Sequence, residues 1–328
     1  MSTDVTTPVP AGPARVPEPE QPGRRQRFAM LRSRADTKVS PYLYIAPFFV
    51  LFAIFGLYPL VYTLWVSLHD WQLASAEHPW SGLENYRQLV TDPVFWNALW
   101  NTFGIFVLST VPQLALALFV ASLLNRRLRG RTFLRLSVIL PMATSVAAVS
   151  IVFSQLFSRD FGLVNWVLGG VGVQPVEWQA AKWSSWSAVA LMVNWRWTGY
   201  NALIYLAAMQ AIPRDLYEAA ALDGAGAWKQ FTTVTVPLLR PTILFTVIIS
   251  TIGGFQLFTE PLLFNSGSSN YQGGSLRQSQ TVAMYVWENA FVKFDFGYAS
   301  AVAWVLFLII LVASALNFLA VRRLGGKD

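Results

Sequence analysis

The side chains in this chain that could do chemistry are aromatic rings and neutral amides within its most apolar stretches. Trp197 and Asn201 are four residues apart, so they share a face if residues 186–210 form a helix. Flat rings and uncharged amides suit a solute with many hydroxyl groups and an apolar ring face. Helix packing or lipid contact is the alternative for each residue, but polar amides in lipid seldom stay unused. The candidate solute-path residues are Asn194, Arg196, Trp197, Tyr200, Asn201, Gln256 and Phe258.

Arg196 is the one charged residue inside the stretch 186–210. An arginine at mid-membrane costs about 2.5 kcal/mol or more, so it must face protein or water. Two interpretations remain open: the guanidinium binds backbone carbonyls or Glu260, or it lines the solute path. The apolar stretches contain essentially no carboxylates, whereas ion-coupled carriers usually keep acidic residues deep in their helices.

Catalytic and metal-binding motifs are absent from the sequence. The chain has no cysteine, and the spacing of His69 and His78 matches no zinc motif. The pair Gly326-Lys327 lacks the upstream glycine of a phosphate-binding loop. We therefore expect no enzymatic activity and no cofactor or metal on this chain, and its energy must come from a partner or an ion gradient.

Membrane-spanning helices must position these residues. The chain is 54% hydrophobic and only 12% charged, and a bilayer core about 30 Å thick needs about 20 helical residues. Six stretches qualify, which predicts an all-α transmembrane protein in which Pro59, Pro112 and Pro141 kink or begin helices. The predicted spans are residues 41–68, 96–125, 136–158, 186–210, 241–259 and 296–321.

Lysine and arginine are distributed unevenly between the predicted loops, which sets the orientation. The outer loops hold few: Arg87, Arg159, Lys182, Arg277 and Lys293. The inner segments hold clusters: Arg126, Arg127, Arg129, Arg131 and Arg135, then Arg322, Arg323 and Lys327. Both termini are therefore predicted to be cytoplasmic. The net charge of +7 then indicates contact with anionic lipid rather than nucleic acid.

The sequence also predicts domain boundaries and an aromatic belt. Residues 1–40 form a basic, proline-rich tail that cannot bury enough apolar surface to order itself. Residues 41–95 hold the first span and an outer loop, and residues 96–328 form the core. Tryptophans at the outer ends of the spans predict an interfacial belt, namely Trp71, Trp80, Trp96, Trp183 and Trp186.

Residues 211–241 form the long inner loop between two spans. Pro213 suits the first turn of a helix, and Asp215 and Glu218 place negative charge near its positive end. Asp223-Gly224 is a turn signal. The face formed by Leu216, Ala219 and Ala220 is narrow and small, as needed where another protein approaches closely, and Trp228 and Phe231 follow three residues apart. The loop therefore predicts a structured helix–turn–helix at the membrane surface.

This loop resembles the EAA loop of the membrane subunits of binding-protein-dependent ABC importers. The resemblance rests on Glu218-Ala219-Ala220, Asp223-Gly224-Ala225, Phe231, Pro237, Leu239, Arg240 and Pro241. The stretch from residues 194–197 through Leu206 to Ile212-Pro213 is similar to the carbohydrate-uptake branch, whose best-known members carry maltose or glycerol phosphate. Residues 296–301 show the same similarity. One departure is the segment 265–280, which is longer and more polar than the glycine-rich turn of many members.

The resemblance implies a six-helix, type-1 ABC transmembrane domain in a bacterial-type plasma membrane. It implies three partners: a second, homologous permease subunit, a cytoplasmic ATPase dimer that holds ATP and magnesium, and an extracytoplasmic solute-binding protein. Residues 218–231, including Trp228 and Phe231, would form the coupling helix that sits in a cleft of one ATPase. The implied cargo is a sugar, with a di- or oligosaccharide favoured. Glycerol phosphate remains the alternative cargo, and an ion-coupled carrier and a membrane-embedded enzyme are the other classes.

Overall fold

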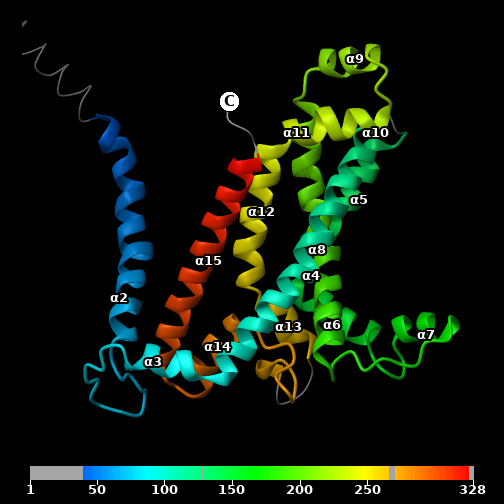
Figure 1. Ribbon diagram of the computed structural model, residues 1–328. Helices are drawn as coiled ribbons and strands as arrows, with labels where there is room; N and C mark the ends of the chain where they lie inside the picture. The colour runs from blue at the N-terminus through cyan, green and yellow to red at the C-terminus, as the bar shows by residue number, and fades with distance from the viewer. Residues whose placement is uncertain (1–39, 127–128, 266–269, 325–328) are drawn as a thin grey trace, which may run out of the picture. The chain divides into compact units, whose positions relative to one another are not determined.

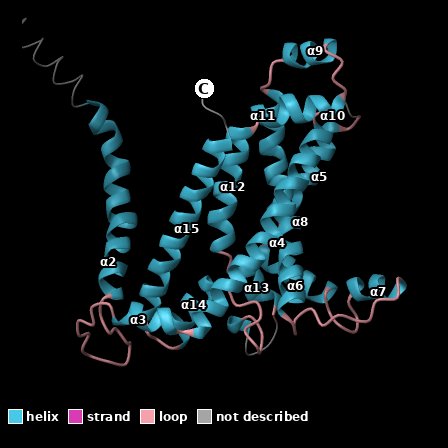
Figure 2. Cartoon of the chain, viewed as in Figure 1, coloured by secondary structure: helices cyan, strands magenta, loops and turns pink. Residues whose placement is uncertain are grey.

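The computed structural model describes residues 40–126, 129–265 and 270–324, with side chains up to residue 320. Helices and turns make up this part of the chain, and its only β-pairing is two isolated bridges (Figure 2). The short π- and 3-10-helical turns are η1 (Ala53–Leu57), η2 (Phe231–Thr235), η3 (Asn270–Gln272) and η4 (Glu288–Val292). The α-helices are α2 (Tyr58–Ser67), α3 (Glu84–Thr91), α4 (Pro93–Leu124), α5 (Arg131–Ala143), α6 (Val146–Leu156), α7 (Leu163–Gly170), α8 (Lys182–Gln210), α9 (Arg214–Leu222), α10 (Ala227–Gln230), α11 (Val236–Leu238), α12 (Arg240–Phe255), α13 (Thr259–Phe264), α14 (Val282–Trp287) and α15 (Phe296–Leu324).

Helices of membrane-crossing length are present, as the sequence predicts. Among the described residues, Ser40–Ser67, Pro93–Leu124 and Phe296–Ala320 are long and apolar enough to cross a bilayer. Two pairs of helices that meet at a sharp bend also pass this test together, namely Arg131–Ala143 with Val146–Leu156 and Ala227–Leu238 with Arg240–Phe255. If each pair is one span, the number of candidate spans rises from 3 to 5. Helix α8 has 29 residues but lies outside this count. The all-α, membrane-spanning class is confirmed, whereas the number six and the cytoplasmic termini stay predictions.

The predicted span 136–158 is not one continuous helix, and its break lies three residues after Pro141, where the sequence predicts a kink or a helix start. Helices α5 and α6 meet at an angle of 91° around Thr144 and Ser145. The backbone of Thr144 is extended, with ψ of 148°, and its hydroxyl donates a hydrogen bond to the Pro141 carbonyl oxygen (2.5 Å). The break therefore satisfies a carbonyl at the C-terminal end of α5, where the last carbonyls of a helix lack intrahelical partners.

The predicted span 241–259 is also interrupted. Helix α12 ends at Phe255, and helical structure resumes at Thr259 as α13. The Thr281 hydroxyl donates a hydrogen bond to the Leu257 carbonyl oxygen in the gap (2.7 Å). Non-helical backbone at membrane depth is tolerated where protein or a water-filled cavity satisfies its polar groups. The sequence does not indicate this break, because Thr281, the partner of the Leu257 carbonyl, lies 24 residues away.

The chain divides into two compact units, Met1–Val61 and Tyr62–Asp328. The predicted tail falls almost wholly on residues 1–39, which lie outside the described residues. The described part of the first unit is helical from residue 40 and exposes apolar side chains along its length. The predicted boundaries after residues 40 and 95 stay predictions.

Helices α4 and α8 form the centre of the second unit (Figure 1). Helix α4 contributes to all three buried apolar clusters, through Phe95, Ile105 and Ala117 among others. Helix α5 packs along α8. A Cβ atom at Gly199 would lie 1.7 Å from the Val138 carbonyl oxygen, so only glycine permits this close approach of α5 and α8.

Asp92 joins three helices at the end of the unit opposite α9. Its side chain accepts a hydrogen bond from the Val94 amide (2.8 Å) and so caps α4, with Pro93 in the first turn. The hydroxyls of Tyr285 in α14 and Tyr298 in α15 donate hydrogen bonds to the same carboxylate. Burial raises the pKa of Asp92, but these hydrogen bonds outweigh burial, so the pKa lies below its ordinary value.

A polar segment at this end is buried instead of solvated. The residues Gln278, Ser279, Gln280 and Thr281 are at most 2% exposed. The Arg277 guanidinium donates to both carboxylate oxygens of Glu288 (2.6 and 2.8 Å), and the Asn101 amide donates to the Arg277 carbonyl oxygen (2.8 Å). These bonds give the charged groups of Arg277 and Glu288 partners, and such pairing is what allows polar groups to be buried in an apolar bundle. The side-chain oxygens of Asn101 and Asn265 are buried without a partner among the described residues.

The same segment corrects the prediction for Trp186. This side chain is only 2% exposed and belongs to the core, so it is not part of an interfacial belt. Its indole nitrogen donates a hydrogen bond to the Gln278 carbonyl oxygen (2.9 Å). An inward-facing tryptophan is stable when its N–H finds such a partner. The predicted belt residues Trp80, Trp96 and Trp183 are exposed.

Candidate functional site: a polar cavity and an exposed helix

A cavity of about 270 Å³ lies between α4, α8, α12 and the break that follows α12. Its wall combines aromatic rings, amides, hydroxyls and one carboxylate. The lining residues are Ser109, Thr110, Gln113, Val193, Trp197, Tyr200, Asn201, Ile249, Ser250, Gly253, Gly254, Gln256, Leu257, Phe258, Thr259 and Glu260.

The structure brings most of the predicted solute-path residues to this cavity. Trp197, Tyr200 and Asn201 line it from α8, and Gln256 and Phe258 line it from the break after α12. The Trp197 and Tyr200 rings meet edge to face, with centroids 5.9 Å apart. Because two separate chain segments supply these groups, the cavity offers rings and amides from different directions.

Two predicted residues, Asn194 and Arg196, do not line the cavity. Asn194 is buried in α8, and its side-chain oxygen has no hydrogen-bond partner among the described residues. The Arg196 guanidinium donates a hydrogen bond to the Glu260 carboxylate (2.7 Å), and the two side chains are 11% and 9% exposed. Of the two interpretations of Arg196, the ion pair with Glu260 is the one that the structure contains.

Glu260 carries this ion pair into the cavity wall. The Arg196 guanidinium also lies over the Trp197 ring, with its central carbon 5.9 Å from the ring centroid. A buried carboxylate is stable when a cation and good hydrogen-bond geometry compensate its desolvation. The pair therefore leaves an acceptor of hydrogen bonds in the wall without adding net charge.

Sequence reasoning missed the contribution of α4. Ser109, Thr110 and Gln113 line the cavity from the middle of this helix, beside Pro112. Polar residues grouped around a proline in an otherwise charge-free span were the available signal, because such groups in a membrane tend to hydrogen-bond or line a path. Their position opposite α8 depends on helix packing, which the sequence does not display.

Two adjacent glycines of α12 have different surroundings. A Cβ atom at Gly254 would lie 2.6 Å from the Phe106 ring, so Gly254 is needed for packing between α12 and α4. A Cβ atom at Gly253 would have no neighbour within 4 Å. Gly253 therefore leaves open space at the cavity wall, where a larger side chain would reduce the volume.

The helix–turn–helix predicted for residues 211–241 is present. Helix α9 ends in a left-handed turn at Gly224, with φ of +74°. The Ala225 amide donates to the Ala220 carbonyl oxygen (2.9 Å), and the Gly224 amide donates to the Ala221 carbonyl oxygen (3.0 Å). This pair of bonds is a Schellman cap, and glycine adopts the left-handed conformation that such a cap requires without steric cost.

The rest of α9 presents its side chains outward. No residue of α9 is buried, and Leu222 is 90% exposed. Glu218 and Ala219 are exposed near the middle of the helix, while the Tyr217 hydroxyl bonds to that of Thr235 (2.9 Å). In this half of the motif the structure therefore leaves side chains free to meet another protein.

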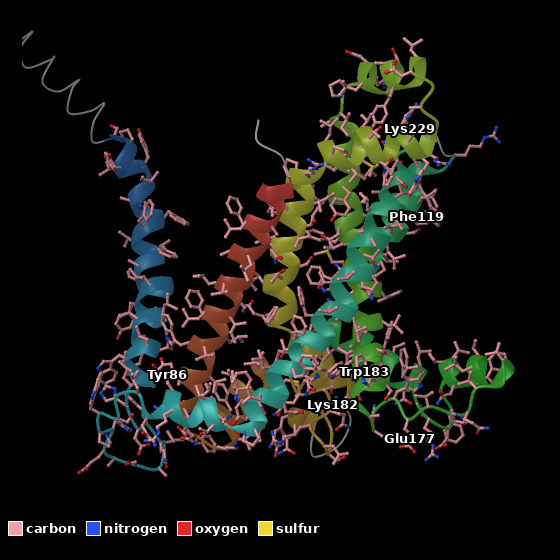
Figure 3. All side chains as sticks on the ribbon, in the orientation of Figure 1. Tyr86, Phe119, Glu177, Lys182, Trp183 and Lys229 are labelled. Carbon is pink, nitrogen blue, oxygen red and sulfur yellow. The ribbon has the colours of Figure 1, made fainter. Side chains whose placement is uncertain are left out.

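The second half of the loop supports α9 from the membrane side. The rings of Trp228 and Phe231 stack with centroids 5.8 Å apart. Trp228 is exposed, and Phe231 packs against the apolar cluster formed by the ends of α4 and α8. Figure 3 shows Lys229 in this half, beside the end of α4 that carries Phe119.

Comparison with known proteins places the chain in a family. The family model described as "Binding-protein-dependent transport system inner membrane component" matches residues 113–326. The lactose transport system permease protein LacF of Rhizobium radiobacter is 38% identical and aligns over 87% of this chain and 95% of its own. The arabinooligosaccharides transport system permease protein AraP of Halalkalibacterium halodurans is 35% identical over 84% of this chain and 86% of its own.

The fold is shared with a solved transporter structure. A chain of the bacterial ABC transporter involved in the import of the acidic polysaccharide alginate aligns with a TM-score of 0.75 and 21% identity, covering 90% of this chain and 100% of that chain. The family match, the two relatives and the apolar helices agree on a multi-pass inner-membrane protein. The chain belongs to the family of binding-protein-dependent transport system inner membrane components.

Proposed function

We propose that this chain is the permease subunit of an ATP-driven ABC importer and that the cavity between α4, α8 and α12 is part of the path of a neutral sugar. The lining of that cavity carries the proposal. Trp197 and Tyr200 offer flat apolar surfaces, and Gln113, Asn201 and Gln256 offer uncharged amides. A sugar has apolar ring faces and many hydroxyls, so both kinds of group have a partner on it.

The charge of the cavity favours an uncharged cargo. Its carboxylate, Glu260, is paired with Arg196, so an anion entering the cavity finds no free cation among the described lining residues. Glycerol phosphate, the alternative cargo, would need cations that a second subunit supplies. An ion-coupled carrier would need a carboxylate free to bind and release its ion, whereas Glu260 already has a cationic partner.

The names of the relatives support a di- or oligosaccharide. The cavity volume of about 270 Å³ lies just below the roughly 300–1,000 Å³ typical of small-molecule sites, so the volume does not select the length of the sugar. The relatives named for lactose and for arabinooligosaccharides are 38% and 35% identical to this chain.

Helix α9 is proposed as the lever that couples this path to ATP. The chain contains no phosphate-binding loop, so ATP and magnesium would be held by a separate cytoplasmic ATPase dimer. The exposed face around Glu218 and Ala219 would sit in a cleft of one ATPase, with Trp228 and Phe231 supporting the helix from behind. Closure of the dimer on ATP would move α9 and open the cavity outward, and hydrolysis would reset it.

The proposed assembly also contains a second, homologous permease subunit and an extracytoplasmic solute-binding protein. Within it, this chain would cross the membrane six times with both termini in the cytoplasm. Arginines gathered near α9 and the start of α5 support that orientation, because positive charge favours the cytoplasmic side. Those among the described residues are Arg126, Arg129, Arg131, Arg135, Arg214 and Arg240.

Affinity purification from native membranes in mild detergent, followed by mass spectrometry, tests this proposal. The variant Glu218→Arg reverses charge on the exposed face of α9. Asp160→Arg is the matched control, because it makes the same change at an exposed position at the opposite end of the unit. We expect the wild type and the control to retain an ATPase with a phosphate-binding loop and a second membrane subunit, and Glu218→Arg to lose only the ATPase. Recovery of the chain alone, or identical partners for Glu218→Arg and wild type, would contradict the proposal.

A further inference from the structure

Helix α7 (Leu163–Gly170) displays an apolar face that no other described element covers. Leu163, Trp166 and Val167 recur at helical spacing and are exposed, with Trp166 at 76%. The residues that flank the helix are also apolar and exposed, with Phe161 at 94% and Val171 at 76%. Exposed apolar surface of this kind marks a site of contact with a membrane or another molecule.

The opposite face of α7 is fixed to its own loop through Asn165. The Asn165 side-chain amide donates to the carbonyl oxygens of Arg159 and Val176 (2.9 Å each). Its oxygen accepts from the Val176 amide (3.2 Å) and from the Trp178 indole nitrogen (2.9 Å). These four hydrogen bonds of one buried side chain fix the orientation of α7. The apolar face is therefore exposed because the loop holds the helix in this orientation.

The charges around α7 lie on its borders. Residues 161–176 contain no Asp, Glu, Lys, Arg or His. The borders carry the ion pair between Arg159 and Glu177 (2.6 Å), and Lys182 follows at the start of α8. A charge-free apolar segment between charged borders matches the polarity profile of the boundary between lipid headgroups and acyl chains.

The position of α7 matches that boundary. It lies crosswise at the end of the bundle where the membrane-length helices α4 and α15 begin (Figure 1). Figure 3 shows Trp183 nearly level with α7 and Glu177 farther toward that end of the molecule. Exposed tryptophans at the same end, Trp96 and Trp183, are residues typical of a membrane interface.

We propose that α7 is an interfacial membrane anchor, with Phe161, Leu163, Trp166, Val167 and Val171 inserted into the lipid surface and Asn165 facing the protein. A lipid surface fits this face better than a protein partner does. Protein interfaces carry about one hydrogen bond per 100–200 Å². The polar side chain of α7, Asn165, already makes its hydrogen bonds within its own loop. The insertion would be shallow, about 5–10 Å into the headgroup boundary, and would brace the outer ends of α6 and α8.

Single cysteines can test the anchor cleanly because the natural chain contains none. The full chain, with the subunits that purify with it, is reconstituted into nanodiscs of phosphatidylcholine and phosphatidylglycerol. Nitroxide labels are attached to Val167→Cys and Val171→Cys in α7 and its flank. Asp160→Cys serves as the water-exposed control and Val312→Cys in α15 as the lipid-exposed control. Collision of each label with oxygen and with a water-soluble nickel complex is measured by paramagnetic resonance.

The proposal predicts that labels at 167 and 171 collide more with oxygen than with nickel, with values between those at 160 and 312. Loss of this oxygen preference when the same proteins are moved from nanodiscs to a polymer without lipid would support it further. Labels that resemble Asp160→Cys would overturn the anchor, because the face would then be in water. Labels shielded from both oxygen and nickel would also overturn it, because a protein partner would then cover the face. Neither the oxygen nor the nickel measurement depends on transport activity, so the membrane anchor and the proposed function can fail separately.

Discussion

Arg196 forms a buried ion pair with Glu260, the carboxylate in the wall of the cavity. Its place in an apolar helix predicts that it faces protein or water, and Glu260 is a candidate partner from the sequence. The pairing itself depends on the break after α12, which turns Glu260 toward α8 across 64 residues of chain. The sequence also predicted the lining residues Trp197, Tyr200 and Asn201, which share α8 with Arg196. It missed Ser109 and Gln113, because their position opposite α8 depends on how α4 packs.

Breaking the Arg196–Glu260 pair on one side should destabilise the chain strongly. Arg196→Met leaves a buried carboxylate without its cation, a change that typically costs about 3–5 kcal/mol. The double variant Arg196→Met/Glu260→Gln removes both charges, so we expect it to recover most of that stability. Thermal unfolding of the purified chain in detergent measures the effect. Destabilisations that simply add in the double variant would contradict a direct pair.

At the scale of elements, the helix–turn–helix of residues 211–241 separates into structural and exposed parts. Ala220, Gly224 and Ala225 build the Schellman cap of α9, whereas Glu218 and Ala219 remain exposed. Turn chemistry and helical spacing predict this element because its hydrogen bonds are local. The buried segment 278–281 is the opposite case: its partners Asn101 and Trp186 lie far away in sequence, and its composition alone predicts a solvated loop.

The ion pair that holds this buried segment predicts a pH dependence. Burial raises the pKa of Glu288, but hydrogen bonds from Arg277 and Gln280 outweigh burial and leave the pKa below its ordinary value of 4.5. A carboxyl whose pKa is lowered by folding stabilises the folded state above its unfolded pKa. That stability is lost as the pH falls below about 4.5, toward the lower pKa of the folded state.

Hydrogen exchange of residues 273–292 between pH 7 and pH 3 measures this effect once the intrinsic rates are corrected. We expect protection to fall in the acid range for the wild type. Glu288→Gln, which cannot ionise, should show lower protection at neutral pH and little further change on acidification. An acid response that is the same in both proteins would show that another group is responsible.

At the scale of the whole molecule, charge separates the two ends of the second unit. Arginines gather near α9 and the start of α5, while the opposite end mixes Arg159, Arg277 and Lys293 with acidic partners. The sequence predicts this asymmetry directly, because it depends on composition between apolar stretches. The angles of the broken helices and the division at Val61 depend on packing, which composition does not encode.

Single-cysteine labelling in intact cells tests the predicted topology. We expect a membrane-impermeant maleimide to label Ser75→Cys and Asp160→Cys from outside and to leave Gly226→Cys unlabelled until the cells are opened. Gly226 lies in the turn between α9 and α10, where an added Cβ atom would have no neighbour within 4 Å. Labelling of Gly226→Cys in intact cells would reverse the orientation and remove α9 from the cytoplasm.

The central claim, that the cavity beside Gly253 is the solute path, is tested most directly by ATP-dependent uptake into proteoliposomes. The whole importer is reconstituted with Gly253→Leu, which fills the cavity, and with Gly253→Ala as the matched control. The labelled cargo is the neutral oligosaccharide that the wild type imports best. The leucine side chain would occupy open space in the cavity wall where the cargo would pass, and each loss of about 1.4 kcal/mol in binding is tenfold. We therefore expect roughly tenfold or greater loss of uptake for the leucine variant, with assembly intact and the alanine variant close to wild type. Unchanged uptake by Gly253→Leu in a correctly assembled importer would contradict the account.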